Sequence, residues 1–317
     1  MKMTVNRPLL AHLSLFGACA GWGLMAPVGK EAMTHGISGI AMVAFRVVGA
    51  AILFWLTSLF TKREHVAGKD KIMFFFAAIF GLVCNQCCFT IGLSITSPIN
   101  ASIVTTSMPI FAMIFAALIL HEPITGKKAA GVFMGCLGAV MLIMSSVVAT
   151  SDKAGELEGD LLCLGAQLSY ALYLSLFRNL VRRYSLITVN KWMFTYASVI
   201  VIPIAYTHVE AIQWSQIAPS TWAECAYVVV VGTFLAYILM MNGQQTLRPT
   251  VVSVYNYVQP IVSVIVSLAA GIAIFGWSQA LAVVLVFSGV WLVTKSKSRA
   301  DIEKARAAAA NSTAKTR

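Results

Sequence analysis

Ten apolar stretches, each close to the length that crosses a lipid bilayer, constrain the fold of this chain more than any motif. They run over residues 9–29, 38–60, 72–94, 98–120, 128–148, 159–180, 189–207, 220–242, 249–271 and 277–294. A spanning helix needs about 20 mostly apolar residues. The stretches lack the alternating pattern of barrel strands, the other element that can cross hydrocarbon. The sequence therefore predicts an all-α membrane protein with ten transmembrane helices.

The balance of charge agrees with this class. Of the 317 residues, 59% are hydrophobic and only 11% are charged, which leaves too little polar surface for a soluble globule. If the N-terminus is cytoplasmic, 20 of the 23 Lys and Arg residues fall in cytoplasmic segments. This asymmetry follows the positive-inside rule and predicts that both termini are cytoplasmic. The net charge of +11 therefore indicates topology and contact with the lipid bilayer, with no nucleic-acid partner.

The chain also contains an internal duplication. Pro98 and Pro109 recur as Pro249 and Pro260 at an offset of 151 residues. At the same offset Gly81, Gly92, Ser102 and Gly138 match Gly232, Gly243, Ser253 and Gly289. Internal repeats are common in secondary transporters, and five helices in each copy force the copies into opposite orientations. We predict a first repeat over residues 1–148, an inverted second repeat over 149–294, and a polar cytoplasmic tail over 295–317.

The inner proline of each pair, Pro109 or Pro260, is predicted to lie in the middle of a span. There it removes a backbone hydrogen bond and frees the carbonyl four residues earlier, on Thr105 or Asn256. Broken helix backbone is tolerated in a membrane only where protein buries it or where it lines a wet cavity. We therefore expect two hinged helices that line a central path, with Ser102, Thr105, Ser253 and Asn256 on the lining faces. The alternative is a pair of structural kinks whose polar groups are satisfied by neighbouring helices.

Other polar residues at membrane depth extend the candidate cavity lining. They are Trp22, Asn85, Gln86, Tyr170, Tyr173, Tyr237, Tyr257 and Gln259. Their neutral aromatic and amide groups suit a small amphipathic or aromatic solute, although each could equally make an interhelical contact. Arg46 is the one strong charge near a predicted helix centre, where it needs a partner or water, so its role is either structural or functional.

Enzyme motifs are absent. The sequence has no H-E-x-x-H, G-x-S-x-G or glycine-rich phosphate loop. The cluster C-N-Q-C-C at residues 84–88 lacks a second Cys or His pair at metal-site spacing, so its cysteines are interpreted as packing residues. We expect no enzyme activity, no catalytic residue, no metal and no cofactor.

Several features in a fixed order resemble a known family. They are Trp22 in the first predicted helix, Arg46 within A-F-R-V-V-G-A-A, the segment P-I-N-A-S-I-V-T-T-S-M-P-I-F, and the pair Glu122–Pro123 before a glycine-rich helix. Up to Thr294 the chain resembles the EamA family of the drug/metabolite transporter superfamily. The resemblance implies a basket of ten helices around a central cavity, and transport, commonly export, of small metabolites. Glu122 becomes a gate candidate, on one side only, because its counterpart in the second copy is Ala273.

These observations lead to one main hypothesis. The chain is expected to be a secondary transporter of a bacterial-type cytoplasmic membrane that exports a small amphipathic metabolite, amino-acid-like or aromatic, by alternating access. Its expected partners are the small-molecule substrate and the bilayer, and it acts as a monomer or a homodimer. The alternative is a lipid-linked flippase component of envelope biosynthesis.

Overall fold

The computed structural model describes residues 7–95, 104–146, 157–269 and 277–297, and within these ranges all regular structure is helical. The helices are α1 (Arg7–Thr34), α2 (Gly39–Ser58), α3 (Gly68–Ala78), η1 (Ile79–Cys84), α4 (Asn85–Ile95), α6 (Met108–Leu120), α7 (Gly126–Ser146), α8 (Leu157–Leu176), α9 (Arg178–Val181), α10 (Leu186–Glu210), η2 (Trp214–Gln216), α11 (Pro219–Val229), η3 (Val230–Leu235), α12 (Ala236–Thr246), α13 (Pro249–Val254), η4 (Tyr255–Tyr257), α14 (Val258–Ala269) and α15 (Trp277–Thr294). The all-α prediction is therefore confirmed for the described part of the chain.

Helices occupy the described part of every predicted apolar stretch, but their lengths differ. Five segments of the described chain are long and apolar enough to cross a membrane, namely Arg7–Met25, Gly39–Ser58, Gly68–Leu93, Leu186–Glu210 and Pro219–Thr246. Met108–Leu120 and Ala280–Thr294 are shorter apolar helices. Large apolar side chains such as Phe60, Phe133 and Trp277 are exposed on the outside, as expected where lipid is the solvent. The count of ten spanning helices and the location of the termini remain predictions.

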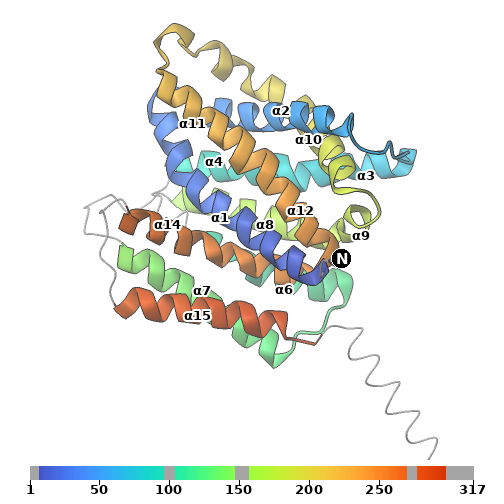
Figure 1. Ribbon diagram of the computed structural model, residues 1–317, viewed down its shortest axis with the longest axis vertical. Helices are drawn as coiled ribbons and strands as arrows, with labels where there is room; N and C mark the ends of the chain where they lie inside the picture. The colour runs from blue at the N-terminus through green and yellow to red at the C-terminus, as the bar shows by residue number, and fades with distance from the viewer. Residues whose placement is uncertain (1–6, 96–103, 147–156, 270–276, 298–317) are drawn as a thin grey trace, which may run out of the picture.

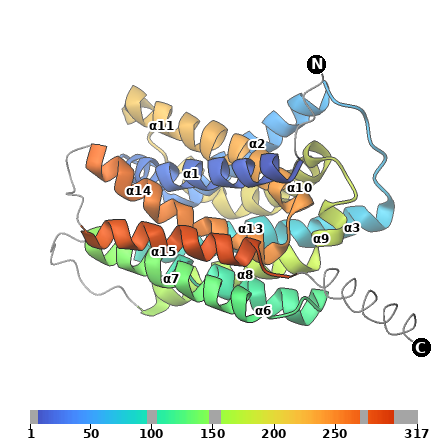
Figure 2. The ribbon, with the colours of Figure 1, turned by 60° about the horizontal axis from the view of Figure 1, so that its bottom comes forward.

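Helices from the two halves of the chain are interleaved. The closest packing joins α7 with α15, α2 with α10, α4 with α8, and α1 with α12, and each pair takes one helix from either half. Figure 1 shows α2 and α10 along one edge of the bundle and α7 and α15 along the other, with α1, α8 and α14 between them. Figure 2 shows α7 and α15 running side by side. Residues far apart in sequence therefore meet in the centre.

Glycines allow the closest of these contacts. On α7, a Cβ added to Gly131 would lie 2.8 Å from the carbonyl oxygen of Gly289, and one added to Gly289 on α15 would lie 2.6 Å from that of Gly131. The spacing of Gly131, Gly135 and Gly138 predicts a close helix–helix interface without naming its partner. The structure identifies that partner as α15.

The duplication is visible in the element boundaries. The segment α3–η1–α4 covers residues 68–95, and α11–η3–α12 covers 219–246, so every boundary is displaced by 151 residues. Each copy contains a π-helical segment, η1 or η3, in the same place. A π-helical segment leaves backbone carbonyls without their usual partner and often marks a functional position.

Both inner prolines lie where the backbone geometry of their segment changes. Pro109 lies in the first turn of α6, behind a turn at Thr106 and Ser107, and Pro260 is the third residue of α14, behind the 3₁₀ segment η4. Each proline thus lies in the first turn of an α-helix, and around Pro260 the segments α13, η4 and α14 follow one another without a gap. The first turn accepts proline because its N–H would have no intrahelical partner there. Ser102 lies outside the described residues.

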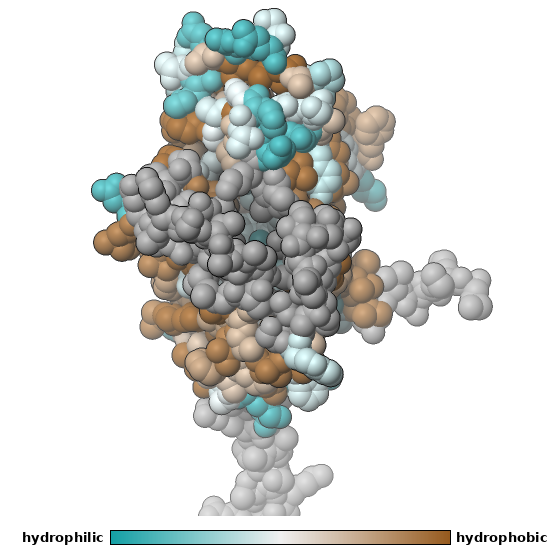
Figure 3. All heavy atoms as spheres, turned by 90° about the vertical axis from the view of Figure 1, so that its left-hand side faces the viewer, coloured by the Kyte–Doolittle hydropathy of each residue, from teal (hydrophilic) through white to brown (hydrophobic). Residues whose placement is uncertain are grey.

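We call the end of the bundle where α1 begins the N-terminal end. The helices α6, α8 and α15 finish at this end, and α7 begins there. Figure 3 views the molecule from the opposite end, where hydrophilic residues gather at the top and apolar residues cover much of the flanks.

Candidate functional site

A cavity of about 160 Å³ lies between α1, α2, α4, α8, α12 and the break that precedes α14. Its lining consists of Trp22, Met25, Gly29, Met33, Met42, Arg46, Asn85, Gln86, Phe89, Thr90, Leu93, Thr105, Gln167, Tyr170, Val228, Tyr237, Asn256 and Gln259. The contribution of α1 comes from its second half, that of α2 from its first half, and that of α4, which ends the segment α3–η1–α4, from most of its length. The cavity therefore extends from the middle of the bundle toward the end opposite the N-terminal end.

The structure brings many of the predicted site residues together in this cavity. Its lining includes Trp22, Arg46, Asn85, Gln86, Thr105, Tyr170, Tyr237, Asn256 and Gln259. These residues come from both halves of the chain and from both broken segments. Thr105 directly precedes the turn before α6, and Asn256 lies within η4, so the two breaks place polar side chains in the same space.

Three predicted residues lie elsewhere. The Tyr257 hydroxyl donates to the carbonyl of Val132 on α7 at 3.1 Å, and Ser253 is fully buried, with its hydroxyl donating to the carbonyl of Thr250 at 2.9 Å. Tyr173 lies on the N-terminal side of the cavity. The prediction listed Tyr257 for its polarity at membrane depth. In a helical run neighbouring residues are about 100° apart, so Tyr257 faces α7 while Asn256 faces the cavity.

The two π-helical segments each offer a carbonyl to a helix of the other half. The Ser169 hydroxyl of α8 donates to the carbonyl of Phe80 in η1 at 2.7 Å. The Trp22 indole N–H of α1 donates to the carbonyl of Gly232 in η3 at 3.0 Å. The Trp22 ring meets Tyr237 edge-on, with centroids 5.7 Å apart. Trp22 therefore anchors α1 through its nitrogen and lines the cavity with its ring.

Arg46 extends from α2 into the cavity. Its Nε donates to the Thr233 hydroxyl at 3.0 Å, and that hydroxyl donates to the carbonyl of Val228 at 2.8 Å. No described residue forms a hydrogen bond or ion pair with the two terminal nitrogens of the guanidinium. No carboxylate lies among the described lining residues. The cavity wall therefore carries a positive charge that the described residues leave unneutralised.

Amides complete the polar lining. The Gln86 amide donates to the Tyr237 hydroxyl at 3.0 Å, and its buried Oε1 has no partner among the described residues. The Asn256 amide contacts the sulfur of Met108 at 3.1 Å, and its oxygen accepts from Gln259 at 3.2 Å. Asn256 thus links the break before α14 to the start of α6.

Toward the N-terminal end a polar layer closes the path. The Gln244 amide donates to the Tyr170 hydroxyl at 2.9 Å, and the Tyr173 hydroxyl donates to Gln244 Oε1 at 3.0 Å. A pocket of only about 10 Å³ lies beyond this layer, lined by Tyr173, Gln244 and Arg178 among others. This space holds about one water molecule. The cavity is therefore closed at this end.

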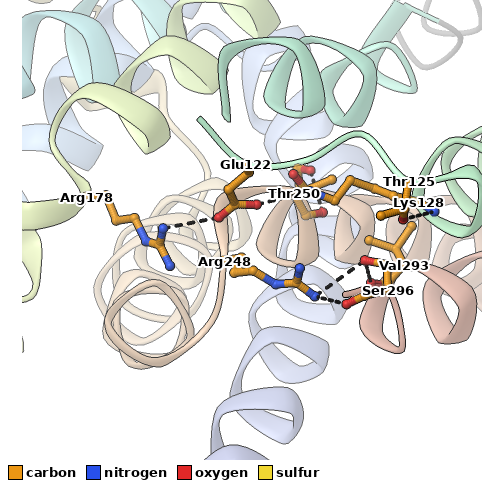
Figure 4. Close-up of polar contacts among 9 residues, drawn as sticks. Glu122, Thr125, Lys128, Arg178, Arg248, Thr250, Val293 and Ser296 are labelled. Atoms are coloured by element: carbon orange, nitrogen blue, oxygen red, sulfur yellow. Dashed lines mark hydrogen bonds and ion pairs between the residues drawn. The ribbon is translucent and has the colours of Figure 1, made fainter. Parts of the chain in front are cut away.

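An ion cluster lies outside the layer. Glu122, just beyond the end of α6, pairs through Oε2 with Lys128 Nζ at 3.1 Å and through Oε1 with Arg178 Nη1 at 3.2 Å (Figure 4). The Glu122 and Lys128 side chains are only 5% and 1% exposed. Arg248 lies beside them and donates to the carbonyl of Ser296 at 2.8 Å. Because Glu122 and Lys128 belong to the first half and Arg178 to the second, the cluster joins the two halves.

The cavity also contains residues that the sequence prediction omitted. Met25, Met33, Met42, Phe89 and Thr90 all line it. An apolar side chain on a membrane helix can face lipid, a neighbouring helix or a cavity, and sequence periodicity does not separate these cases. Within the described ranges, no group of three or more His, Cys, Asp or Glu side chains is placed to hold a metal ion.

Comparison with known proteins gives a consistent result. The sequence model of the EamA-like transporter family matches residues 9–144 and again residues 157–295. The uncharacterized transporter YyaM of Bacillus subtilis is 23% identical over 89% of this chain and 93% of its own length. An uncharacterized transporter of Archaeoglobus fulgidus is 23% identical over 87% of this chain and 95% of its own. One solved crystal structure shares the fold, with a TM-score of 0.71, 19% identity, and coverage of 90% of this chain and 96% of that one.

Proposed function

Because this chain belongs to the EamA-like transporter family and is a multi-pass membrane transporter, we propose that it exports a small amphipathic metabolite by alternating access. The observation that carries this proposal is the central cavity, which is lined from both halves of the chain and is separated from the N-terminal end by the Tyr170–Gln244–Tyr173 layer. We place the protein in a bacterial-type cytoplasmic membrane, with its N-terminal end in the cytoplasm, where the positive-inside rule puts it.

The lining supports recognition of an amphipathic solute. Trp22, Tyr170, Tyr237 and Phe89 offer aromatic surface, while amides and a guanidinium offer hydrogen bonds at a few fixed places. Small-molecule sites typically combine a mainly apolar wall with few oriented polar groups. We expect the segment around Asn256 and Gln259 to contribute more to selectivity than Thr105, because it carries more polar side chains.

The closed end supports the mechanism. In the described conformation the path is closed toward the predicted cytoplasm by the Tyr170–Gln244–Tyr173 layer and then by the Glu122 cluster. Access from the cytoplasm requires both to separate, because the layer joins α8 to α12 and the Glu122 cluster joins α9 to the first half of the chain. The Glu122 cluster therefore acts as a cytoplasmic gate, and the helix breaks before α6 and α14, next to Pro109 and Pro260, act as hinges.

Flux measurements on reconstituted protein test the proposal. Liposomes containing the full-length chain are loaded with unlabelled phenylalanine, leucine or uridine, and counterflow of the labelled solute is followed. We expect counterflow for at least one solute, and none in protein-free liposomes. The substitution Gln244→Leu removes both hydrogen bonds of the Tyr170–Gln244–Tyr173 layer. It should slow counterflow without changing the amount of protein inserted. Absence of counterflow for every solute class would contradict the proposal.

A further inference from the structure

The charge of Arg46 has no anionic partner among the described residues, and an uncharged solute would not supply one. Guanidinium remains protonated at all physiological pH values, and a charge at membrane depth is costly unless it is paired or hydrated. The described residues engage only Nε, through Thr233. Glu31 pairs with His35, and Glu224 on α11, whose Oε2 is buried without a described partner, forms no ion pair with Arg46. The terminal nitrogens thus face the cavity without an anion.

We infer that the transported solute carries a carboxylate and that the terminal nitrogens of Arg46 bind it. This inference rests on the proposed function and specifies its substrate class. Guanidinium presents paired N–H groups whose geometry matches a carboxylate, so both oxygens can be held at once. Nε, anchored by Thr233, orients the fork toward the cavity.

The rest of the lining indicates what the carboxylate is attached to. Trp22, Tyr237, Phe89 and the methionines surround the space beside Arg46 with aromatic and thioether groups. An aromatic or aliphatic body of a size that fits about 160 Å³ would pack there. The Gln86 side chain also lines this space, and its Oε1 is buried without a described partner. A monocarboxylate is favoured over a phosphate ester because one described cation neutralises one charge, not two.

The opposite end of the path is also positive. The cluster in Figure 4 contains three cations, Lys128, Arg178 and Arg248, around the single carboxylate of Glu122. Arg178 Nε and Arg248 Nη1 are buried and have no partner among the described residues. Arg178 also lines the small pocket inside the gate. The excess of cations over carboxylates at this end is compatible with entry of an anionic solute.

Matched probes test the inference directly. 3-Phenylpropionate, 3-phenylpropionamide and 3-phenylpropylamine share one body and differ only in their head group. We expect the purified full-length protein to bind the carboxylate roughly tenfold or more tightly than the amide, and the amine most weakly, when measured by isothermal titration calorimetry. Equal affinity for carboxylate and amide, or no binding of the carboxylate, would overturn the inference.

Substitutions test whether Arg46 causes the preference for the carboxylate over the amide. Arg46→Gln should reduce the carboxylate-to-amide ratio to about one while the amide affinity changes little, because only the charge-assisted bonds are removed. Arg182→Gln is the matched control, since Arg182 is exposed at the N-terminal end and donates to the carbonyl of Gln245. It should leave the ratio unchanged. If Arg46→Gln fails to fold, Arg46→Lys keeps the charge but loses the fork, and it should lower the ratio without abolishing it.

The outcomes separate this inference from the transport proposal. If the protein prefers the carboxylate through Arg46 but no solute is transported, the carboxylate site is supported and the transport proposal is contradicted. Flux that is indifferent to the head group, with an unchanged ratio in Arg46→Gln, overturns the role of Arg46 and leaves transport standing.

Discussion

Glu122 neutralises the most deeply buried cation of the gate. The substitution Glu122→Gln leaves Lys128 buried without its anion and removes a partner of Arg178. Breaking a fully buried ion pair costs about 3–5 kcal/mol, and we expect somewhat less here because the Arg178 side chain is 19% exposed. Thermal unfolding of the purified protein measures the loss. Glu31→Gln, which removes an exposed pair with His35, should have almost no effect.

A double substitution tests whether the loss arises from Lys128. Adding Lys128→Met to Glu122→Gln removes the unpaired charge and should restore part of the stability. Destabilisation that is the same with and without Lys128 would show that the pair is not what Glu122 stabilises.

Asn256 and Thr105 lie at the two helix breaks and face the cavity. Asn256→Ala removes the link to Met108 and Gln259, and we expect a several-fold loss of flux with unchanged protein abundance. Thr105→Val, which replaces a hydroxyl by a methyl of similar size, should cause a smaller loss. Ser253→Ala is the control, because Ser253 faces its own helix backbone. Normal flux in both cavity variants would remove the broken segments from the substrate path.

At the scale of elements, the contact between α7 and α15 depends on glycine. An alanine at position 289 would place its Cβ 2.6 Å from the carbonyl oxygen of Gly131 and from the nitrogen of Gly135, and backbone atoms cannot move aside easily. We expect Gly289→Ala to destabilise the protein by about 1–3 kcal/mol, as overpacking does. Gly165→Ala on α8 has no atom within 4 Å and should be neutral or slightly stabilising. Thermal unfolding distinguishes them, and equal effects would contradict the close packing.

The π-helical segments make a second prediction at this scale. Trp22→Phe retains an aromatic ring in the cavity but leaves the carbonyl of Gly232 without its donor. A buried acceptor left unpaired costs about 1–3 kcal/mol, so stability should fall even where ligand affinity is preserved. Ser169→Ala should have a similar effect through Phe80. Unchanged stability in both would mean that neither side chain supports a π-helical segment.

The orientation of the whole molecule gives a further test. The distribution of Lys and Arg predicts that residue 317 lies in the cytoplasm and that the connection near residue 153 lies outside. A green fluorescent protein fused at the C-terminus should therefore fluoresce, whereas alkaline phosphatase fused near residue 153 should be active. The reverse pattern would place the Glu122 gate on the outer side and reverse the proposed direction of access.

Much of the architecture is readable from the chain, and the reasons are local. Apolar run length located the long helices of the described chain, and the offset of 151 residues anticipated the matching boundaries of α3–η1–α4 and α11–η3–α12. Which face of each helix lines the cavity was harder to predict from the sequence. Trp22, Gln86 and Asn256 were placed in the cavity by their polarity at membrane depth, but Tyr257 was misplaced because polarity alone does not say which face of a helix a residue occupies.

The sequence by itself determined that the chain is a duplicated, all-helical membrane protein with polar residues near two proline positions, because length, hydropathy and repetition are properties of neighbouring residues. Only the tertiary structure decided which helices meet, that α7 packs on α15, that Arg46 is held by Thr233, and that Glu122 joins Lys128 to Arg178. Arg46 meets Thr233, and Glu122 meets Arg178, across the two interleaved halves. No local pattern encodes which of many apolar faces will be paired, since lipid and protein offer a helix nearly the same solvent.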